Sequence, residues 1–94
     1  MFVPLAEKDI QDIYEWYESK RKNLGTEFII ELDRCIDKIS ANPNFAYNVL
    51  PNVKRAAIHR FPYNIYYSIE NATVYIFVIM HQYRNPENWQ LRIK

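Results

Sequence analysis

The chain contains one cysteine, one glycine and no long apolar run among its 94 residues. A single cysteine cannot form an internal disulfide, so we expect a fold that needs none and a cytoplasmic setting. A single glycine excludes a glycine-rich phosphate-binding loop. No stretch approaches the roughly 20 apolar residues of a membrane span, and the N-terminus lacks the basic-then-apolar pattern of a signal peptide. We therefore expect no membrane-bound part.

Metal-ligating residue types are equally sparse. Cys35, His59 and His81 are scattered along the chain and lack the spacing of a zinc site. Cys35 falls on the apolar side of a predicted helix, where a free cysteine usually packs as a small hydrophobic residue. The sequence therefore predicts neither a metal site nor a cofactor.

Charge is unevenly distributed along the chain. Residues 1–50 contain six Lys/Arg and nine Asp/Glu, a net charge of −3, whereas residues 51–94 contain six and two, a net charge of +4. Such a polarised surface permits an anionic partner. It is equally compatible with ordinary solvated helix faces, so charge alone does not establish a partner.

The N-terminal half has the periodicity of two helices. Pro4 suits a first helical turn, and apolar residues then recur at helical spacing as far as Tyr17. A second amphipathic stretch spans residues 26–40 and ends before Asn42-Pro43, because a residue preceding proline disfavours helix. Gly25 lies at the break between the two. Helices of similar length with so short a connection must lie antiparallel.

The C-terminal half has strand patterns at residues 53–59, 63–70 and 73–81, after a predicted loop at residues 44–52. The segment 63–70 alternates, and Asn71-Ala72 suits a tight hairpin turn. Residues 73–81 are almost wholly apolar, which predicts a central strand covered on both faces. The expected fold class is α+β, with one domain over residues 1–94. A helical hairpin packs on an antiparallel sheet of three strands, and residues 1–3 are available for a fourth.

Four features occur in a particular order: a helical hairpin that ends in Asn-Pro, Arg55 on the first long strand, F-P-Y-x-I-Y-Y at residues 61–67, and H-x-x-R-N-P-x-x-W at residues 81–89. In this order and at these spacings they resemble the RelE/ParE superfamily, the toxins of type II toxin–antitoxin modules. The resemblance covers nearly the whole chain. Many members begin with a short strand, for which only residues 1–3 are available here.

The resemblance implies two activities of different kinds. ParE-like members bind and inhibit DNA gyrase, whereas RelE-like members cut messenger RNA in the ribosome without a metal. Either activity implies a cognate antitoxin, whose C-terminal segment would occupy an apolar groove between helical hairpin and sheet. We expect gyrase inhibition, because the basic cluster is thinner than in the ribonuclease members and no tyrosine or histidine follows Arg84. A non-toxic interaction domain is the third alternative.

Cleavage of RNA would need a base, an acid and cations at the phosphate. If the protein is a ribonuclease, the catalytic candidates are His81, Arg84 and Arg60. For an anionic partner of any kind, the candidates are Arg55, Arg60 and Arg84. Because side chains alternate along a strand, Arg55 and Arg60 are predicted on opposite faces. Each also has a structural alternative: a strand-closing hydrogen bond for His81, and ion pairs with acidic residues for the arginines.

Overall fold

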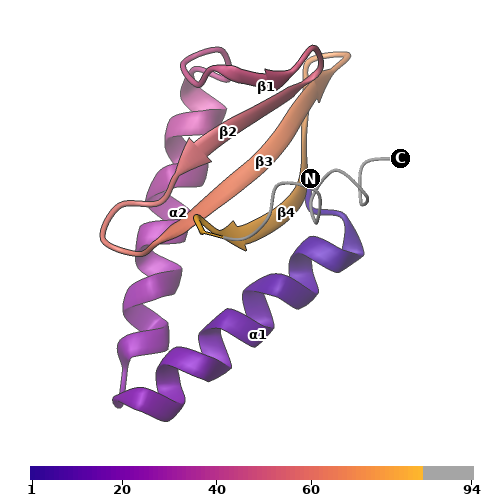
Figure 1. The fold of residues 1–94 in the computed structure, drawn as a ribbon. Coiled ribbons are helices and arrows are strands. Elements are labelled where there is room, and N and C mark those ends of the chain that lie inside the picture. Colours follow the sequence, from indigo (N-terminus) through magenta and orange to yellow (C-terminus); the bar gives the residue numbers. More distant parts are fainter. Residues whose placement is uncertain (84–94) are drawn as a thin grey trace.

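A computed structural model describes residues 1–83 of the chain (Figure 1). The elements in order are α1 Pro4–Lys20, α2 Leu24–Ala41, β1 Asn48–Leu50, β2 Val53–Ala57, β3 Tyr63–Glu70 and β4 Thr73–His81. The strands form one antiparallel sheet in the order β1-β2-β3-β4. The predicted α+β class, with a helical hairpin packed on a small antiparallel sheet, is confirmed.

The two helices meet at a close contact around the only glycine. Helix α2 begins at Leu24, two residues before its predicted start, so Gly25 lies inside its first turn. The left-handed residue of the connection is Asn23, with φ of 69°. The Gly25 N–H donates to a carboxylate oxygen of Glu18 at 2.8 Å. Gly25 therefore serves close packing between the helices, whereas Asn23 makes the turn.

The fourth strand lies where a loop was predicted. Residues 44–52 include β1, which pairs with β2 at the sheet edge. Val49 and Leu50 pack beside Val53, so even this short segment has an apolar side to bury. The N-terminal residues contribute only a minimal strand, a single parallel bridge between Phe2 and Ile76.

The prediction that residues 73–81 form a central strand is wrong, because β4 is the last strand in the sheet order. Its outer edge is partly covered by the N-terminus: the Ile76 N–H donates to the Met1 carbonyl at 2.8 Å, and the Val3 N–H donates to the Ile76 carbonyl at 3.1 Å. Further along, the Ile79 N–H donates to the Asp9 carboxylate at 3.1 Å. An exposed apolar edge strand invites unwanted pairing, and these contacts protect it.

The hairpin between β3 and β4 turns at Asn71 and Ala72, as predicted. Both residues have positive φ, 52° and 65°, as in the type I′ turn that joins twisted antiparallel strands. The register runs from the pair Glu70 and Thr73 back to Tyr63 and His81. This register places His81 at the end of the sheet, next to the start of β3.

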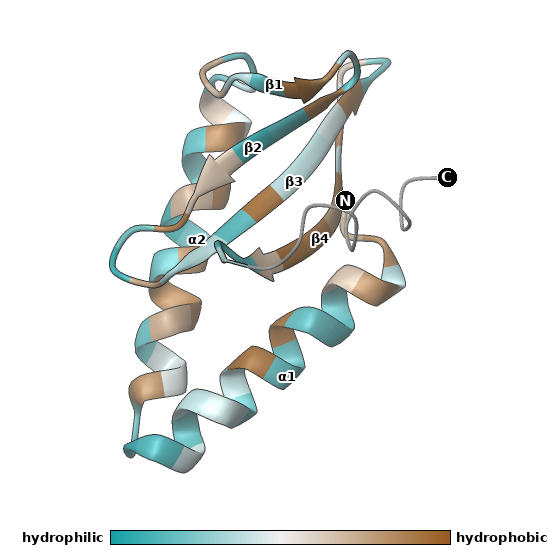
Figure 2. Cartoon of the chain, viewed as in Figure 1, coloured by the Kyte–Doolittle hydropathy of each residue, from teal (hydrophilic) through white to brown (hydrophobic). Residues whose placement is uncertain are grey.

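The main core lies between the helices and one face of the sheet. Polar and apolar residues alternate along both helices (Figure 2), as amphipathic helices require. The fully buried members include Phe28, Ile39, Ile65 and Tyr67. On the opposite sheet face Val53, Tyr66 and Val78 form a second buried cluster. Strand β3 is thus buried on both faces, although its sequence alternates.

Candidate functional site

A groove of about 400 Å³ lies between α1 and the C-terminal half of β4. Its walls combine apolar side chains with two carboxylates and one imidazole, from Asp9, Asp12, Ile13, Trp16, Tyr63, Ile79, Met80 and His81. The groove follows from the fold, since α1 packs against an edge strand. It lies between the first helix of the hairpin and the last strand of the sheet, and its aromatic lining residues are Trp16 and Tyr63.

His81 forms one end of this groove. Its ring packs edge-on against the Tyr63 ring, with the centroids 5.3 Å apart. Its Nδ1 accepts a hydrogen bond from the Tyr83 N–H at 3.2 Å. In the neutral ring this bond assigns the proton to Nε2, which then donates and cannot accept a proton. The structural alternative from the sequence was a bond from His81 to a neighbouring carbonyl, whereas here the ring accepts from a backbone N–H just after the strand.

Arg60 lies in the loop after β2 and is turned toward α2. Its φ of 73° places it in the left-handed region. Its Nη2 donates to the Glu27 carboxylate at 2.9 Å, and Nη1 lies 3.9 Å from the Glu31 carboxylate. The hydrogen bond from Arg60, followed by that from Arg21, lowers the pKa of Glu27. Acidic residues of α2 therefore balance the charge of Arg60.

An aromatic cluster of Tyr17, Phe28, Phe61 and Tyr63 connects the regions of Arg60 and His81. The ring of Phe61 packs edge-on against Tyr17 and Phe28, and so does that of Tyr63. The guanidinium of Arg60 lies over Phe61, at 5.4 Å from the ring centroid. Within residues 1–83 no contact joins Arg60 to His81, so these two catalytic candidates do not converge.

Arg55 occupies the sheet face that points away from the helices. It pairs in register with Tyr66, whereas its neighbours Lys54 and Ala56 pair with residues of the helix-facing core. The guanidinium lies over the ring of Tyr47, at 4.9 Å from its centroid. Arg55 and Arg60 are thus apart, but not through alternation along one strand: β2 ends at Ala57, and Arg60 lies in the loop that follows. Arg84, the third anion-binding candidate, lies outside the described residues.

Two residues that line the groove were missing from the sequence-based candidates. Asp9, predicted only as a helix N-terminal acid, accepts the β4 hydrogen bond and lines the groove. Trp16 lines the same groove with 54% of its surface exposed. The spacing of Asp9, Asp12 and Trp16 places them along one side of α1, next to the apolar stripe. This shared side of α1 could have indicated from the sequence that the three residues lie together. Nothing in the sequence indicated which strand that side would face.

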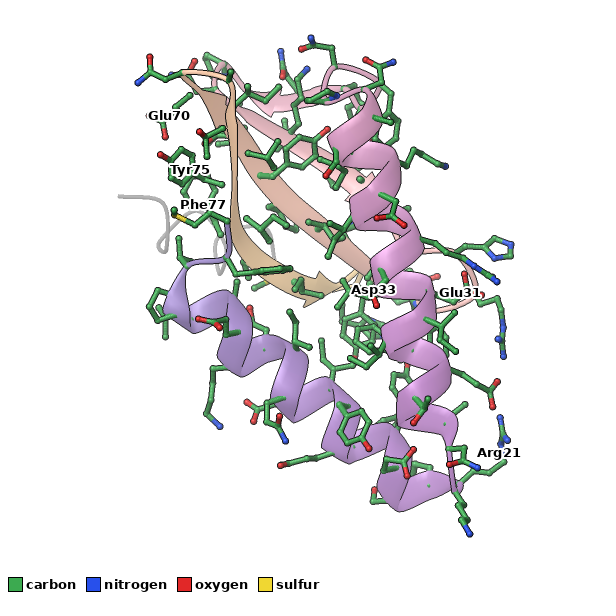
Figure 3. All side chains as sticks on the ribbon, turned by 180° about the vertical axis from the view of Figure 1, so that it is seen from behind. Arg21, Glu31, Asp33, Glu70, Tyr75 and Phe77 are labelled. Atoms are coloured by element: carbon green, nitrogen blue, oxygen red, sulfur yellow. The ribbon has the colours of Figure 1, made fainter. Side chains whose placement is uncertain are left out.

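A buried carboxylate on α2 forms a second cluster of charges. Glu31 is only 4% exposed and points toward the loop after β2 (Figure 3). Arg34 lies 3.3 Å from it, and His59 Nδ1 lies 3.8 Å away. A shallow pocket of about 230 Å³ opens beside this cluster, above Cys35. His59 and Arg60 belong to the loop after β2, so their contacts with Glu31 join this loop to α2.

Cys35 is buried, as the sequence predicted, and burial raises the pKa of its thiol. Among residues 1–83, no three His, Cys, Asp or Glu side chains group closely enough to hold a metal ion. The same part of the chain contains no helix that is both long and apolar enough to cross a membrane.

Comparisons with known proteins match the chain to a protein family and to a solved structure. Residues 1–86 match the family model described as the ParE toxin of the type II toxin-antitoxin system, parDE. A solved structure described as the chromosomal ParDE TA system from P. aeruginosa contains a similar fold, with a TM-score of 0.74 and 15% sequence identity. The match covers 85% of this chain and 90% of that one. Among curated proteins, no sequence matches.

Proposed function

Because the chain belongs to the ParE toxin family of type II toxin–antitoxin systems, we propose that it arrests growth by binding and inhibiting DNA gyrase. The family match over residues 1–86 is the observation that carries this proposal. Gyrase is a target in the cytoplasm, which suits a chain whose only cysteine is a buried free thiol. A cognate antitoxin would neutralise the toxin for as long as the antitoxin is present.

The arrangement of the candidate residues supports binding over cleavage. A metal-free ribonuclease needs an acid, a base and phosphate-binding cations at one place. Here Arg60 is engaged by Glu27, and the Nδ1 of His81 is engaged by the backbone of Tyr83. Arg55 stands on the sheet face away from both helices. For an anionic partner Arg55, Arg60 and Arg84 stay the predicted contacts. Of the two that lie within residues 1–83, Arg60 is paired with Glu27, and no described carboxylate pairs with Arg55.

Supercoiling of relaxed plasmid by purified gyrase and ATP tests the proposal. Increasing amounts of the toxin should abolish supercoiling, and toxin that is first mixed with its antitoxin should not. Full supercoiling at a large excess of toxin would contradict gyrase inhibition. Ribosomes programmed with message form the second arm. If they show cleavage that His81→Ala slows by orders of magnitude, the protein is a ribonuclease instead. Bacteria that express the toxin without its antitoxin and grow normally would favour a non-toxic interaction domain.

We further propose that the antitoxin occupies the groove between α1 and β4. The groove is open, and the apolar side chains of Ile13, Trp16 and Ile79 line it. Extended segments and amphipathic helices bind in grooves of this kind by inserting apolar side chains. Trp16 is the best anchor, because it is half exposed and aromatic residues often dominate binding energy.

Replacing Trp16 tests this location. Trp16→Ala should weaken antitoxin binding by about 2 kcal/mol or more, roughly thirtyfold in Kd, as for an aromatic hot spot. Ile30→Ala is the matched control, since Ile30 is a similarly exposed apolar residue on α2 outside the groove. Titration calorimetry measures both. Equal affinities for the two variants would place the antitoxin elsewhere, without affecting the gyrase proposal.

A further inference from the structure

The sheet face that points away from the helices is buried, although every described member of its apolar cluster comes from a strand. Val53, Tyr66 and Val78 form the centre of this cluster, and Val78 is 0% exposed. Phe77 and Met80 pack beside them. Figure 3 shows Phe77 projecting from β4 away from α2. No helix residue belongs to the cluster, so within residues 1–83 only the strands contribute to it.

A polar residue on the same face shows that water is kept away from it. Tyr67 and Ile69 belong to the helix-facing core, so Ser68 between them points to the opposite side of β3. Ser68 is 4% exposed, and its Oγ has no hydrogen-bond partner within residues 1–83. A hydroxyl on an open sheet face would be in contact with water. The outer face of the sheet is therefore covered.

The strands alone cannot supply this cover. Side chains stand roughly perpendicular to a sheet, so neighbours enclose the sides of a side chain and leave its outer end open. A sheet buries an apolar face only against another layer. The exposed fractions are those of a single copy of the chain, so that layer belongs to the same chain. Both helices, the N-terminal residues and the loops after α2 and β2 contribute to the core on the other face. Residues 84–94 are what is left.

The sequence of residues 84–94 suits such a layer. Trp89, Leu91 and Ile93 are apolar, and each is followed by a polar residue. Alternation with a period of two is typical of an extended segment that has one side on an apolar surface. The segment therefore carries a row of three apolar side chains on one side.

The connection and the length of the segment also fit. Residues 82–83 turn away from the end of β4. Asn85-Pro86 follows, a dipeptide that marks turns, so the chain can reverse direction over the sheet. The eleven residues 84–94 reach about 36 Å when extended, whereas four strands about 4.8 Å apart span only about 15 Å. The segment is long enough to cross the whole outer face.

We infer that residues 84–94 dock across the outer face of the sheet as an extended strap, with Trp89, Leu91 and Ile93 against the cluster of Val53, Tyr66 and Val78. The strap closes this face, which is then not available to a partner as an apolar docking surface. The groove between α1 and β4 stays open on the other side of the molecule. The inference does not rest on gyrase inhibition.

The fluorescence of Trp89 tests the inference on the full chain. The chain has two tryptophans, so Trp16→Phe leaves Trp89 as the sole tryptophan. A docked indole is shielded from water. Its emission should therefore be shifted to shorter wavelength than in the same chain in urea, and acrylamide should quench it several-fold less. Emission and quenching equal to those of the unfolded chain would overturn the inference.

Two substitutions on β4 in this background identify the face. Phe77→Ala removes apolar surface from the outer face, so it should move the Trp89 emission toward that of the unfolded chain and increase quenching. Val74→Ala is the matched control, because Val74 is a partly buried residue of the same strand that packs against the helix-facing core. It should leave Trp89 unchanged. Far-UV circular dichroism checks that both variants stay folded. Equal effects of the two substitutions, or no effect of Phe77→Ala, would contradict docking on this face.

Thermal denaturation supplies an independent readout. Trp89→Ala should lower Tm by roughly 10 °C or more, as for a large aromatic side chain removed from a packed site in a small domain. Gln90→Ala is the control, because the alternation directs its side chain to solvent, and its Tm should stay that of the wild type. Equal Tm values for the two variants would overturn the inference. Protection of Trp89 that is lost on dilution would do so as well, since it would identify a second copy of the chain as the cover.

Discussion

Replacing Gly25 with alanine should destabilise the protein although alanine is the better helix former. A Cβ added at Gly25 would lie 2.6 Å from the backbone oxygen of Tyr14 and 2.8 Å from Cγ of Glu18. Real Cβ contacts are essentially never shorter than 3.0 Å, so the two helices must separate or tilt. The critical neighbour is a backbone atom in the middle of α1, which no side-chain rotation can move.

The size of the effect follows from two opposing terms. Inserting a methyl group into a tightly packed contact costs about 1–3 kcal/mol. Alanine recovers at most about 1 kcal/mol of helix propensity. Because the closest atom is a backbone oxygen, the upper part of that range, about 2–3 kcal/mol, applies. The Gly25→Ala variant should therefore lose about 1–2 kcal/mol of unfolding free energy. In a domain of this size, each kcal/mol lowers Tm by roughly 4–8 °C.

Thermal denaturation followed by circular dichroism measures this loss, with Thr26→Ala as the matched control. Thr26 is the next residue of α2 and is exposed, so its replacement gains propensity without any new contact. Adding Glu18→Ala to Gly25→Ala should not restore stability, because the Tyr14 oxygen remains the closest obstacle. A Gly25→Ala variant as stable as the wild type would refute the argument, since the helices could then separate at no cost.

Three further predictions concern the turn, an ion pair and the core. Ala72→Gly should raise unfolding free energy by about 1 kcal/mol in urea denaturation, because Ala72 has a φ of 65° that glycine adopts without strain. If the wild type, with alanine at this position, is more stable than Ala72→Gly, this account is contradicted. Tyr67→Phe should cost about 1 kcal/mol in the same assay, since it removes a 2.7 Å hydrogen bond and leaves the Pro43 carbonyl without that donor. Unchanged stability would mean that another donor replaces it. The lowered pKa of Glu27, caused first by Arg60, contributes stability above the carboxylate's usual pKa near 4.5 that is lost as pH falls through the lowered value. Glu27→Gln should therefore lose less stability than the wild type on acidification below about pH 4.5, and parallel pH profiles would refute this.

Local signals predicted most of the fold. The start of α1 at Pro4, the bounds of β3 and β4, and the turn at Asn71 were all read correctly from periodicity and turn chemistry. These features depend on neighbouring residues only. The role of Gly25 could not be read in this way, because it depends on how closely α1 approaches α2. A single glycine near a break between helices has the same sequence pattern whether it caps a helix or lets a second helix pack closely against it.

The position of β4 shows a second limit of sequence patterns. An apolar run usually indicates a central strand, yet β4 is the last strand of the sheet. Its apolar residues are buried because α1 packs along one face and Met1 and Val3 hydrogen-bond to its edge. Those contacts join residues about 70 positions apart in the chain. Periodicity reports how much of a strand is buried, but it does not report what buries it.

In the candidate site, the type of a residue does not determine its role, because residues of the same type have different contacts in the fold. Arg55 and Arg60 are both arginines in or close to β2, and the sequence offered both as contacts for an anionic partner. The structure gives them different surroundings: Arg60 meets Glu27 on α2, whereas Arg55 meets the ring of Tyr47. A paired guanidinium must lose its carboxylate before it can bind an anion, and an unpaired one need not. Whether an arginine is free to bind an anionic partner thus depends on the side chains around it, and the fold determines which side chains these are.

The edge of β4 explains why the groove lies where it does. The N-terminus covers the edge near Ile76, and Asp9 covers it at Ile79. The Gln82 N–H bonds to the Pro62 carbonyl on the β3 side. Because backbone groups alternate sides along a strand, the N–H of His81 points outward, on the same side as that of Ile79. Among residues 1–83, the groove opens where the cover from the chain's own residues ends. An antitoxin segment in this groove could therefore add backbone hydrogen bonds to the apolar contacts of Trp16, which would give it both affinity and register.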